Sequence, residues 1–285
     1  MIPIAIVSKG RADNLTTLSL LKDALKNKQF YIFVEPDEVE EYSVLEEDHI
    51  KVIGFEAKSI GVEDAVNKTF EWFHDSEFEQ FWLLDDDIQD MYDRTEFDTT
   101  SSERDYWHLE TIRDKPDKIV KAFEEMENQL LRKDYSQMGL SYRQTNVHFN
   151  GDWKENDKCL VFVLMNLKYV DKHADWCHVW GDIELSLRMI VQGKTNCVCY
   201  KYAFGYPGMA KQKGGLTDYY NSDRAIKETK ETVEGFRSKY GRFVRSTVKK
   251  HHGNKLYEIR VNWKEASKIG KHKVNDKFAD IFGGK

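Results

Sequence analysis

The chain of 285 residues carries a net charge of -6, and 40% of its residues are apolar and 13% aromatic. This composition is that of a packed globular protein and excludes a disordered or low-complexity chain. The longest apolar run, residues 159–167, has about half of the ~18 residues that a membrane-spanning helix needs, and the opening MIPIAIV is too short for a signal peptide. We therefore expect a cytoplasmic protein that does not bind a membrane.

The first 92 residues predict alternating strands and helices. Apolar segments at residues 2–7, 29–34 and 50–55 predict strands, and the leucines that recur after Asn14 predict a helix capped by that residue. A second helix is expected over residues 61–73. This order is typical of βαβ units, so the expected fold class is α/β, with a Rossmann-like, mostly parallel sheet flanked by helices.

Three consecutive carboxylates follow the next predicted strand. Residues 81–84 are fully apolar, as in a strand buried on both sides, and Asp85, Asp86 and Asp87 come at its carboxyl end, where open α/β sheets bind ligands. Because alternate residues of an extended strand share a face, Asp85 and Asp87 are expected to point one way and Asp86 the other. Such a pair forms a hard-oxygen site for Mg²⁺ or Mn²⁺. An acidic loop cap explains the triplet equally well.

The rest of the chain predicts further elements of one domain. Residues 93–118 are polar and predict an irregular segment with a loop over residues 98–104. Further helices are expected at residues 119–131, 183–191 and 223–240. Further strands are expected at residues 139–150, 159–169 and 195–200, with a turn at residues 151–157 and a glycine-rich loop at residues 205–215.

A second acidic pair opens one of these helices. Asp182 and Glu184 lie in the sequence GDIELSLR, at the expected N-terminal turn, where the helix dipole stabilises negative charge. By itself the pair is explained by Asp182 acting as a helix cap.

The C-terminal end of the chain is strongly basic. Residues 237–285 carry 14 Lys and Arg against four acidic residues, a charge of +10, which leaves -16 on residues 1–236. We interpret residues 237–285 as a basic helical extension that meets a polyanion, with a lysine-rich solvated helix as the alternative. The residues expected to contact nucleic-acid phosphates are Arg237, Arg242, Arg245, Lys249, Lys250, His251 and His252.

Together these motifs resemble a known enzyme family. A strand ending in an Asp-rich turn, followed about a hundred residues later by an acidic pair and Leu-Ser-Leu-Arg, resembles glycosyltransferases of the GT-A fold. Within that fold the chain is similar to the phage TET-associated glycosyltransferases, relatives of the base J glucosyltransferase, over roughly residues 2–215. The similarity rests on the opening IAIVSKGRADNL, the VEPDE turn, the helix after residues 59–61, the LLDDDI strand and the loop near Gly214 and Gly215.

The resemblance implies an activity. It predicts an inverting hexosyl- or pentosyltransferase that moves a sugar from a nucleotide-sugar, a UDP-sugar, to the hydroxyl of 5-hydroxymethylcytosine or 5-hydroxymethyluracil in phage DNA. The protein would then act in the cytoplasm of the infected bacterial host. A hydroxymethyl group on C5 of a pyrimidine lies in the major groove, so the enzyme could reach it in an intact duplex or on a base turned out of the duplex.

The resemblance also implies roles for residues. Asp85 and Asp87 would hold Mn²⁺ or Mg²⁺ on the donor diphosphate, and Asp182 would be the catalytic base. Gly181 stands where the family motif has an acid, which makes Glu184 the nearest substitute for the base. The implied donor-binding residues are Ser8, Lys9, Gly10, Arg11, Glu35, Asn67, Asp86 and Lys211. In a retaining enzyme Asp182 would position the acceptor or the sugar instead.

Three other readings remain open at the level of sequence. The first is a GT-A glycosyltransferase with a carbohydrate, lipid-linked or protein acceptor. The second is a nuclease in which Asp85, Asp87, Asp182 and Glu184 hold two metal ions, and the third is a non-catalytic DNA-binding protein. The identity of the sugar depends on the shape of a pocket, which no motif here reports, and the sequence also leaves the oligomeric state open.

Overall fold

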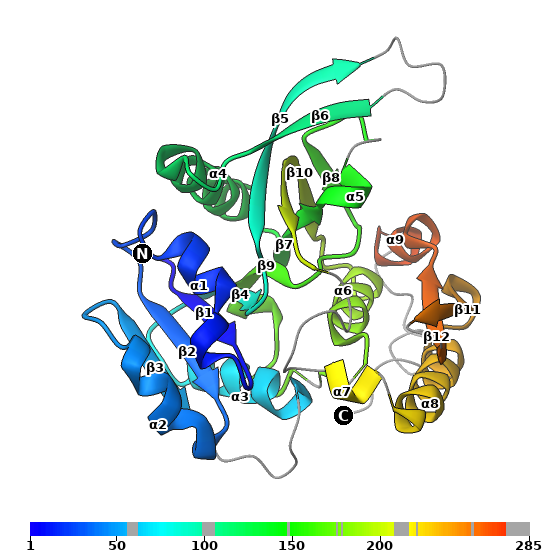
Figure 1. Cartoon of the computed structure of the whole chain (residues 1–285). Helices are drawn as coiled ribbons and strands as arrows, with labels where there is room; N and C mark the ends of the chain where they lie inside the picture. The colour runs from blue at the N-terminus through cyan, green and yellow to red at the C-terminus, as the bar shows by residue number, and fades with distance from the viewer. Residues whose placement is uncertain are drawn as a thin grey trace.

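One central sheet organises the molecule. The computed structural model describes residues 1–55, 62–98, 106–146, 149–174, 176–177, 179–207, 217–220, 222–251 and 254–271. Over these residues helices cover both faces of the sheet, and the C-terminal elements pack beside it (Figure 1). The expected α/β fold class, with a mostly parallel sheet flanked by helices, is confirmed.

The described part of the sheet has ten strands, in the order β3-β2-β1-β4-β9-β7-β10-β5-β6 with β8 paired to β10. One half is entirely parallel and consists of β1 (Ile4–Val7), β2 (Phe30–Val34), β3 (Ile50–Gly54) and β4 (Gln80–Asp85). The other half is mixed and consists of β5 (Asp90–Asp98), β6 (Tyr106–Thr111), β7 (Gln137–Tyr142), β8 (Trp153–Glu155), β9 (Phe162–Asn166) and β10 (Cys197–Gly205). The pairings give β7 and β10 the direction of β4, so the carboxyl ends of β1, β2, β4, β7 and β10 lie along one edge.

Alternating side chains of β4 pack against helices on opposite faces. Trp82 and Leu84 belong to the core with α1 (Thr16–Leu21) and α4 (Pro116–Lys133). Phe81 and Leu83 belong to the core with α3 (Val62–His74) and α6 (Gly181–Val191), where Phe81 stacks on Phe73 with ring centroids 4.2 Å apart. Each such burial stabilises the fold by roughly 1.5–3 kcal/mol, which holds the end of β4 in a fixed position.

The C-terminal elements form a third packing layer on α6. They are α8 (Asp223–Tyr240), β11 (Val244–His251), β12 (Asn254–Val261) and α9 (Trp263–Lys271). Ile183, Leu187 and Ile190 of α6 share a core with these elements. The expected helical extension is therefore wrong for residues 244–261, which pair as an antiparallel hairpin. The predicted domain boundary after residue 236 falls inside α8.

Three local predictions are corrected. Residues 93–98 and 106–111 are not irregular but belong to the β5–β6 hairpin. Charged side chains on both faces remove the alternation of apolar and polar residues that predicts a strand. The expected turn at residues 151–157 contains β8. Asn14 ends a short 3-10 helix (Ala12–Asn14), and α1 begins after Leu15 without a side-chain cap. Most of the loop expected at residues 98–104, and residues 208–216 of the glycine-rich loop, lie outside the described residues.

The remaining short helices are α2 (Val39–Tyr42), α5 (Arg143–Asn146) and α7 (Thr217–Tyr220). Among the helices that the structure describes, none has the length and apolar character needed to cross a membrane.

Candidate active site

The acidic triplet forms a turn that neighbouring elements hold in place. Strand β4 ends at Asp85, and Asp86 and Asp87 follow in a turn. The backbone carbonyl of Asp85 accepts a hydrogen bond from Thr17 Oγ1 at 2.6 Å, and the same oxygen atom of Thr17 accepts one from the N–H of Ile88 at 2.9 Å. Helix α1 therefore fixes both sides of the turn.

Asp86 faces the protein interior. The residue is 5% exposed, and its side chain accepts a hydrogen bond from Ser8 Oγ at 2.7 Å and forms an ion pair with Arg11. The Nη1 atom of Arg11 also lies 3.5 Å from Oδ2 of Asp87. The expected alternation is thus wrong, because the extended backbone ends at Asp85 and the turn brings Asp86 and Asp87 to the same arginine. Direct contact of Asp86 and Arg11 with a donor stays a prediction.

Asp85 is open to solvent and surrounded by other acidic groups. Its carboxylate has no hydrogen-bond partner among the described residues, although burial of the surrounding site raises its pKa well above the ordinary value. The carboxylates of Asp87, Asp86 and Asp182 raise this pKa further because they oppose a second negative charge nearby. Burial, followed by the charge of Asp86, raises the pKa of Asp87 to about 6.

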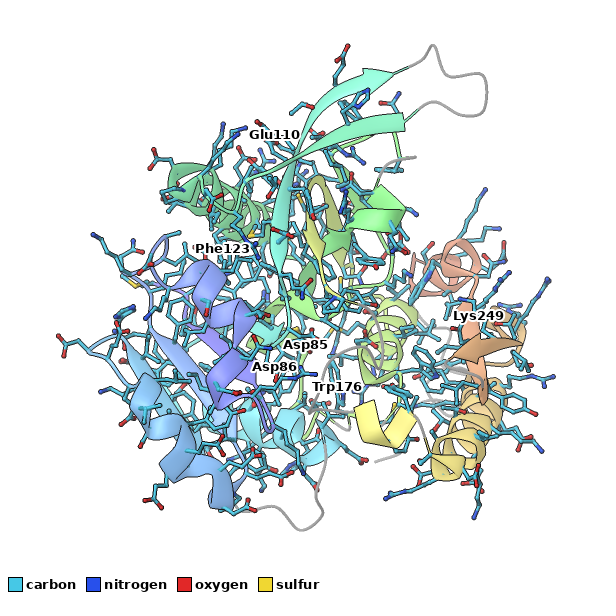
Figure 2. All side chains as sticks on the ribbon, in the orientation of Figure 1. Asp85, Asp86, Glu110, Phe123, Trp176 and Lys249 are labelled. Atoms are coloured by element: carbon cyan, nitrogen blue, oxygen red, sulfur yellow. The ribbon has the colours of Figure 1, made fainter. Side chains whose placement is uncertain are left out.

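The second acidic motif meets the first at this point. Asp182 lies in the first turn of α6, where its Oδ1 accepts a hydrogen bond from the N–H of Ile183 at 2.8 Å. Burial raises the pKa of Asp182 to about 6. The charge of Asp182 contributes to the raised pKa of Asp85, so the two carboxylates lie within electrostatic range. Figure 2 shows Asp85 on the side of the β1–β4 strands that faces α6.

Trp176 explains why glycine precedes Asp182. A Cβ atom at Gly181 would lie 2.2 Å from Nε1 of Trp176 and 2.5 Å from two further ring atoms. Asn67 of α3 holds this tryptophan, because its amide accepts from the backbone N–H of Trp176 at 3.0 Å and donates to its carbonyl at 3.4 Å. The position of the missing acid is thus filled by an indole. Asn67 positions the segment before α6, and its contact with a donor stays a prediction.

Glu184 contacts the C-terminal layer. The residue is 6% exposed, and its side chain packs toward α8, where Oε1 accepts hydrogen bonds from Lys239 Nζ at 2.8 Å and from the hydroxyl of Tyr240. Two residues along a helix turn a side chain through about 200°, which separates Glu184 from the face that bears Asp182. The role of Glu184 as a substitute base stays a prediction, which these contacts do not favour.

Most of the other residues predicted to bind the donor gather at the ends of β1 and β2. Lys9 Nζ lies 2.7 Å from Oε1 of the buried Glu35, and the backbone N–H of Gly10 donates to Glu38 at 2.9 Å. The hydroxyl of Tyr42 lies 2.7 Å from Ser8 Oγ. The predicted donor ligand Lys211 lies outside the described residues.

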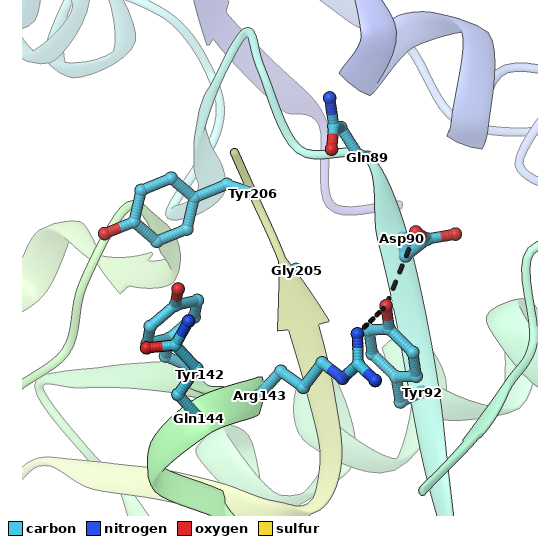
Figure 3. Close-up of a pocket in the computed structure, with 8 residues that line it drawn as sticks. All are labelled: Gln89, Asp90, Tyr92, Tyr142, Arg143, Gln144, Gly205 and Tyr206. Atoms are coloured by element: carbon cyan, nitrogen blue, oxygen red, sulfur yellow. Dashed lines mark hydrogen bonds between the residues drawn. The ribbon is translucent and has the colours of Figure 1, made fainter. Parts of the chain in front are cut away.

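A pocket adjoins the triplet on the other side of β4. It has a volume of about 440 Å³ and lies at the ends of β7 and β10 and the start of β5 (Figure 3). Burial raises the pKa of the Tyr206 hydroxyl, and Tyr142 and then the carboxylates of Asp85, Asp182 and Asp87 raise it further. Tyr206 therefore lines the pocket and lies within electrostatic range of the acidic residues. The residues that line the pocket are Gln89, Asp90, Tyr92, Tyr142, Arg143, Gln144, Gly205 and Tyr206.

The predicted metal ligands fit a cation whose coordination shell is completed by the phosphates of a substrate. The described part of the chain contains no group of three His, Cys, Asp or Glu residues arranged to hold a metal ion. Asp85 is accessible, and neighbouring carboxylates raise its pKa. A bound cation would reduce the repulsion between these negative charges. Mg²⁺ is commonly bound by one or two carboxylates together with waters and substrate phosphates. Asp85 and Asp87 as the carboxylates of such a site stay a prediction.

Four of the predicted nucleic-acid ligands lie on the surface of the C-terminal layer. Arg237, Arg242, Arg245 and Lys249 are exposed, and Lys249 Nζ is 2.7 Å from Glu258 Oε2. Figure 2 shows Lys249 at the outer side of this layer. Lys250 and His251 belong to β11, and no contact of their side chains is described. His252 lies outside the described residues.

Several site residues were not found from sequence. Thr17 and Tyr42 hold the turn through hydroxyl groups, and no pattern distinguishes them from ordinary helix residues. Tyr220 of α7 was missed as well, although its raised pKa reflects burial and then, among others, the carboxylates of Asp182 and Asp85. Arg260 was missed because it comes after the basic cluster, yet it pairs directly with Arg245 across the hairpin. If residues 244–261 had been predicted as a hairpin, the register of its two strands would have placed Arg260 opposite Arg245.

The sheet and the two acidic motifs at its edge define a glycosyltransferase with a GT-A-like α/β fold. The chain matches the family model described as TET-Associated Glycosyltransferase over residues 2–215. It therefore belongs to the TET-associated glycosyltransferase family, as the opening strand, the LLDDDI strand and the Asp182 helix predict. Comparison with curated proteins gives no match.

Proposed function

We propose that this protein transfers a sugar from a UDP-sugar to the hydroxyl of a 5-hydroxymethylpyrimidine in DNA, with inversion at the anomeric carbon. The observation that carries the proposal is that Asp85 and Asp182, from motifs a hundred residues apart, lie within electrostatic range of each other beside a pocket at the carboxyl edge of the sheet. A donor and an acceptor need two adjoining sites of this kind. Membership of the family supports the reaction class.

The donor side is assigned to the ends of β1, β2 and β4. Asp85 and Asp87 would hold a divalent cation, whose chemistry is to neutralise the charge that develops on a departing diphosphate. Lys9 can turn from Glu35 to add a charge-assisted contact to a phosphate, because its side chain is 42% exposed. Arg11 holds Asp86 and Asp87 in position.

Asp182 is assigned as the base of the transfer. The acceptor oxygen forms a bond to the anomeric carbon while the bond from that carbon to the diphosphate oxygen breaks. The proton of the acceptor hydroxyl passes to Asp182, and UDP leaves with the bonding electrons. A carboxylate with a pKa of about 6 is ionised at neutral pH and basic enough to accept this proton.

The hairpin β11–β12 supports DNA as the carrier of the acceptor. Arg245 and Arg260 are directly opposite each other and exposed. Like charges in this position destabilise a hairpin, and a phosphate between them would offset the repulsion. The nuclease alternative is not favoured, because Glu184 faces α8 and the described residues contain no multi-ligand metal cluster.

A nucleoside assay tests the proposal. DNA containing 5-hydroxymethylcytosine or 5-hydroxymethyluracil is incubated with the protein, Mn²⁺ or Mg²⁺ and a set of UDP-sugars, then digested and analysed by mass spectrometry. A nucleoside heavier by a hexose or pentose residue is expected, and its loss is expected with EDTA and in Asp85→Ala plus Asp87→Ala. Asp75→Ala, at an exposed carboxylate on another surface, is the matched control. Donor hydrolysis without any modified nucleoside would contradict a DNA acceptor.

A further inference from the structure

We propose that the pocket at the ends of β7 and β10 receives the acceptor base, turned out of the DNA duplex and stacked on Tyr206 and Tyr142. This inference rests on the proposed function and adds to it how the acceptor base enters the active site. Four features of the pocket carry it: its position, its size, its aromatic side and its polar side chains.

The position of the pocket separates it from the donor side. Strand β4 and its acidic turn lie between the residues at the ends of β1 and β2 and the pocket at the ends of β7 and β10. Ser8, Lys9 and Glu35 are on the first side, and Tyr206 is on the second. Gln89 lines the pocket and follows Asp87 by two residues, so a ligand in the pocket adjoins the acidic turn. Asp182 lies within electrostatic range of Tyr206.

The size of the pocket fits one base rather than a duplex. A volume of about 440 Å³ is within the range of ~300–1,000 Å³ typical of small-ligand sites. Gly205 helps to keep this space open, because a Cβ atom there would lie 3.1 Å from the ring of Tyr92 and 3.7 Å from Asp90. Enzymes that act on a base commonly turn it out of the stack to reach such a pocket.

One side of the pocket is aromatic. The rings of Tyr142 and Tyr206 are 4.8 Å apart, and Phe204 stacks behind Tyr206 with a centroid distance of 6.0 Å. Both tyrosines are half-buried, so each leaves ring surface to a ligand. Figure 3 shows the two rings on the same side of the pocket. Stacking on aromatic rings is how proteins hold unpaired bases.

Polar side chains of the pocket offer hydrogen bonds. Arg143 and Gln144 are exposed at the start of α5, directly after β7, and Gln89 lies next to the acidic turn. Arg143 carries five N–H donors, and its Nη1 donates to the hydroxyl of Tyr92 at 3.1 Å, which directs the guanidinium across the pocket (Figure 3). Amide and guanidinium groups match the carbonyl and amino groups on the edge of a pyrimidine.

The first test varies the base pair and needs no mutant. Steady-state transfer is measured on duplexes in which 5-hydroxymethylcytosine faces guanine or an abasic site. A base that must be turned out should give a kcat/KM about tenfold or more higher opposite the abasic site, because no pairing has to be broken. Equal kcat/KM for both duplexes would overturn the inference and leave the proposed function intact.

The second test varies the pocket. Arg143→Ala and Tyr206→Ala should raise KM for the hydroxymethylated oligonucleotide by about tenfold or more, whereas Tyr206→Phe keeps the ring and should keep this KM. Donor affinity, measured by UDP titration, is the companion readout. Arg132→Ala on α4 and Tyr169→Ala beside Asp134 are the matched controls.

The outcomes separate the two proposals. Unchanged acceptor KM in Arg143→Ala and Tyr206→Ala overturns the pocket assignment alone. If Tyr206→Ala does not fold, Arg143→Ala and the base-pair series decide. Transfer to a saccharide but to no hydroxymethylated DNA contradicts the proposed function and, with it, the assignment of a base to this pocket.

Discussion

Asp182 has to lose its proton before it can act as a base, and its surroundings oppose that loss. Burial raises its pKa to about 6, and the N–H of Ile183 and the charge of Lys158 oppose this shift only in part. Transfer should therefore rise with pH through about 6 and level off above it. Asp182→Asn should lower kcat by about 10²–10⁴-fold and retain donor binding. A wild-type kcat that is flat between about pH 5 and 8 would contradict this role.

The charge on Asp85 should cost stability when no cation is present. The surrounding protein atoms, which displace water from the site, and then the carboxylates of Asp87, Asp86 and Asp182 raise the folded-state pKa of Asp85 above its unfolded value. Because the residue is exposed, solvent screens this repulsion and the effect on stability is small. Its ionised form then destabilises the fold above the folded-state pKa, and the cost vanishes as the pH falls below the unfolded pKa. Asp85→Asn should raise Tm by about 2 °C near pH 8 in EDTA, with no gain near pH 4. Melting curves at the two pH values check this, and a lower Tm near pH 8 would refute it.

Glycine at residue 181 should be needed for stability, although glycine within a helix usually lowers it. In Gly181→Ala the new methyl group overlaps the indole of Trp176, and forcing a group into a packed site costs about 1–3 kcal/mol. Transfer should fall as well, because Trp176 precedes the Asp182 helix. Gly235→Ala in α8 is the control, since no atom lies within 4 Å of the added Cβ and stability should rise by about 0.4–1 kcal/mol. Urea unfolding of both variants measures their free energies of unfolding. Equal changes in the two variants would contradict the prediction.

At the scale of elements, Glu184 connects α6 to α8. Glu184→Gln should lower the free energy of unfolding by about 1–3 kcal/mol, because it weakens the bonds to Lys239 and Tyr240 in a buried setting. The folded variant should retain wild-type kcat and the pH profile of transfer. A catalytic role would instead give a large fall in kcat with little change in unfolding, so the two measurements together separate the roles.

The elements that could be predicted are those whose side chains repeat regularly. Fully apolar strands such as residues 81–84, and helices with one apolar face, follow from periodicity because burial imposes it. The β5–β6 hairpin was missed since its charged residues bond to neighbouring elements, as Asp93 does when it accepts a hydrogen bond from Lys118 of α4 at 2.8 Å. In the site, the acidic motifs were found, but the contacts of Glu184 with α8 were not, because a motif does not say which helix face meets a neighbouring layer.

At the scale of the whole molecule, apolar residues of the basic C-terminal segment are part of the core that holds α6. Tyr240, Phe243 and Ile259 share a core with Leu187, so removing residues 237–285 would expose apolar surface of the helix that bears Asp182. A truncation therefore cannot separate DNA binding from folding. Exposed charges can, because their substitution leaves this packing in place.

Charge reversal on the hairpin gives the corresponding prediction. Arg245→Glu plus Arg260→Glu should weaken DNA binding and lower the salt dependence of log Kd by about 0.9 for each phosphate that the hairpin no longer neutralises. The effect should be similar for all sequences, since binding to phosphates carries no sequence information. Lys121→Glu plus Arg132→Glu on α4 changes the net charge equally at another surface and is the control. If both double variants bind DNA with the same Kd and salt dependence, net charge rather than the hairpin attracts DNA, and the phosphates are bound elsewhere on the protein.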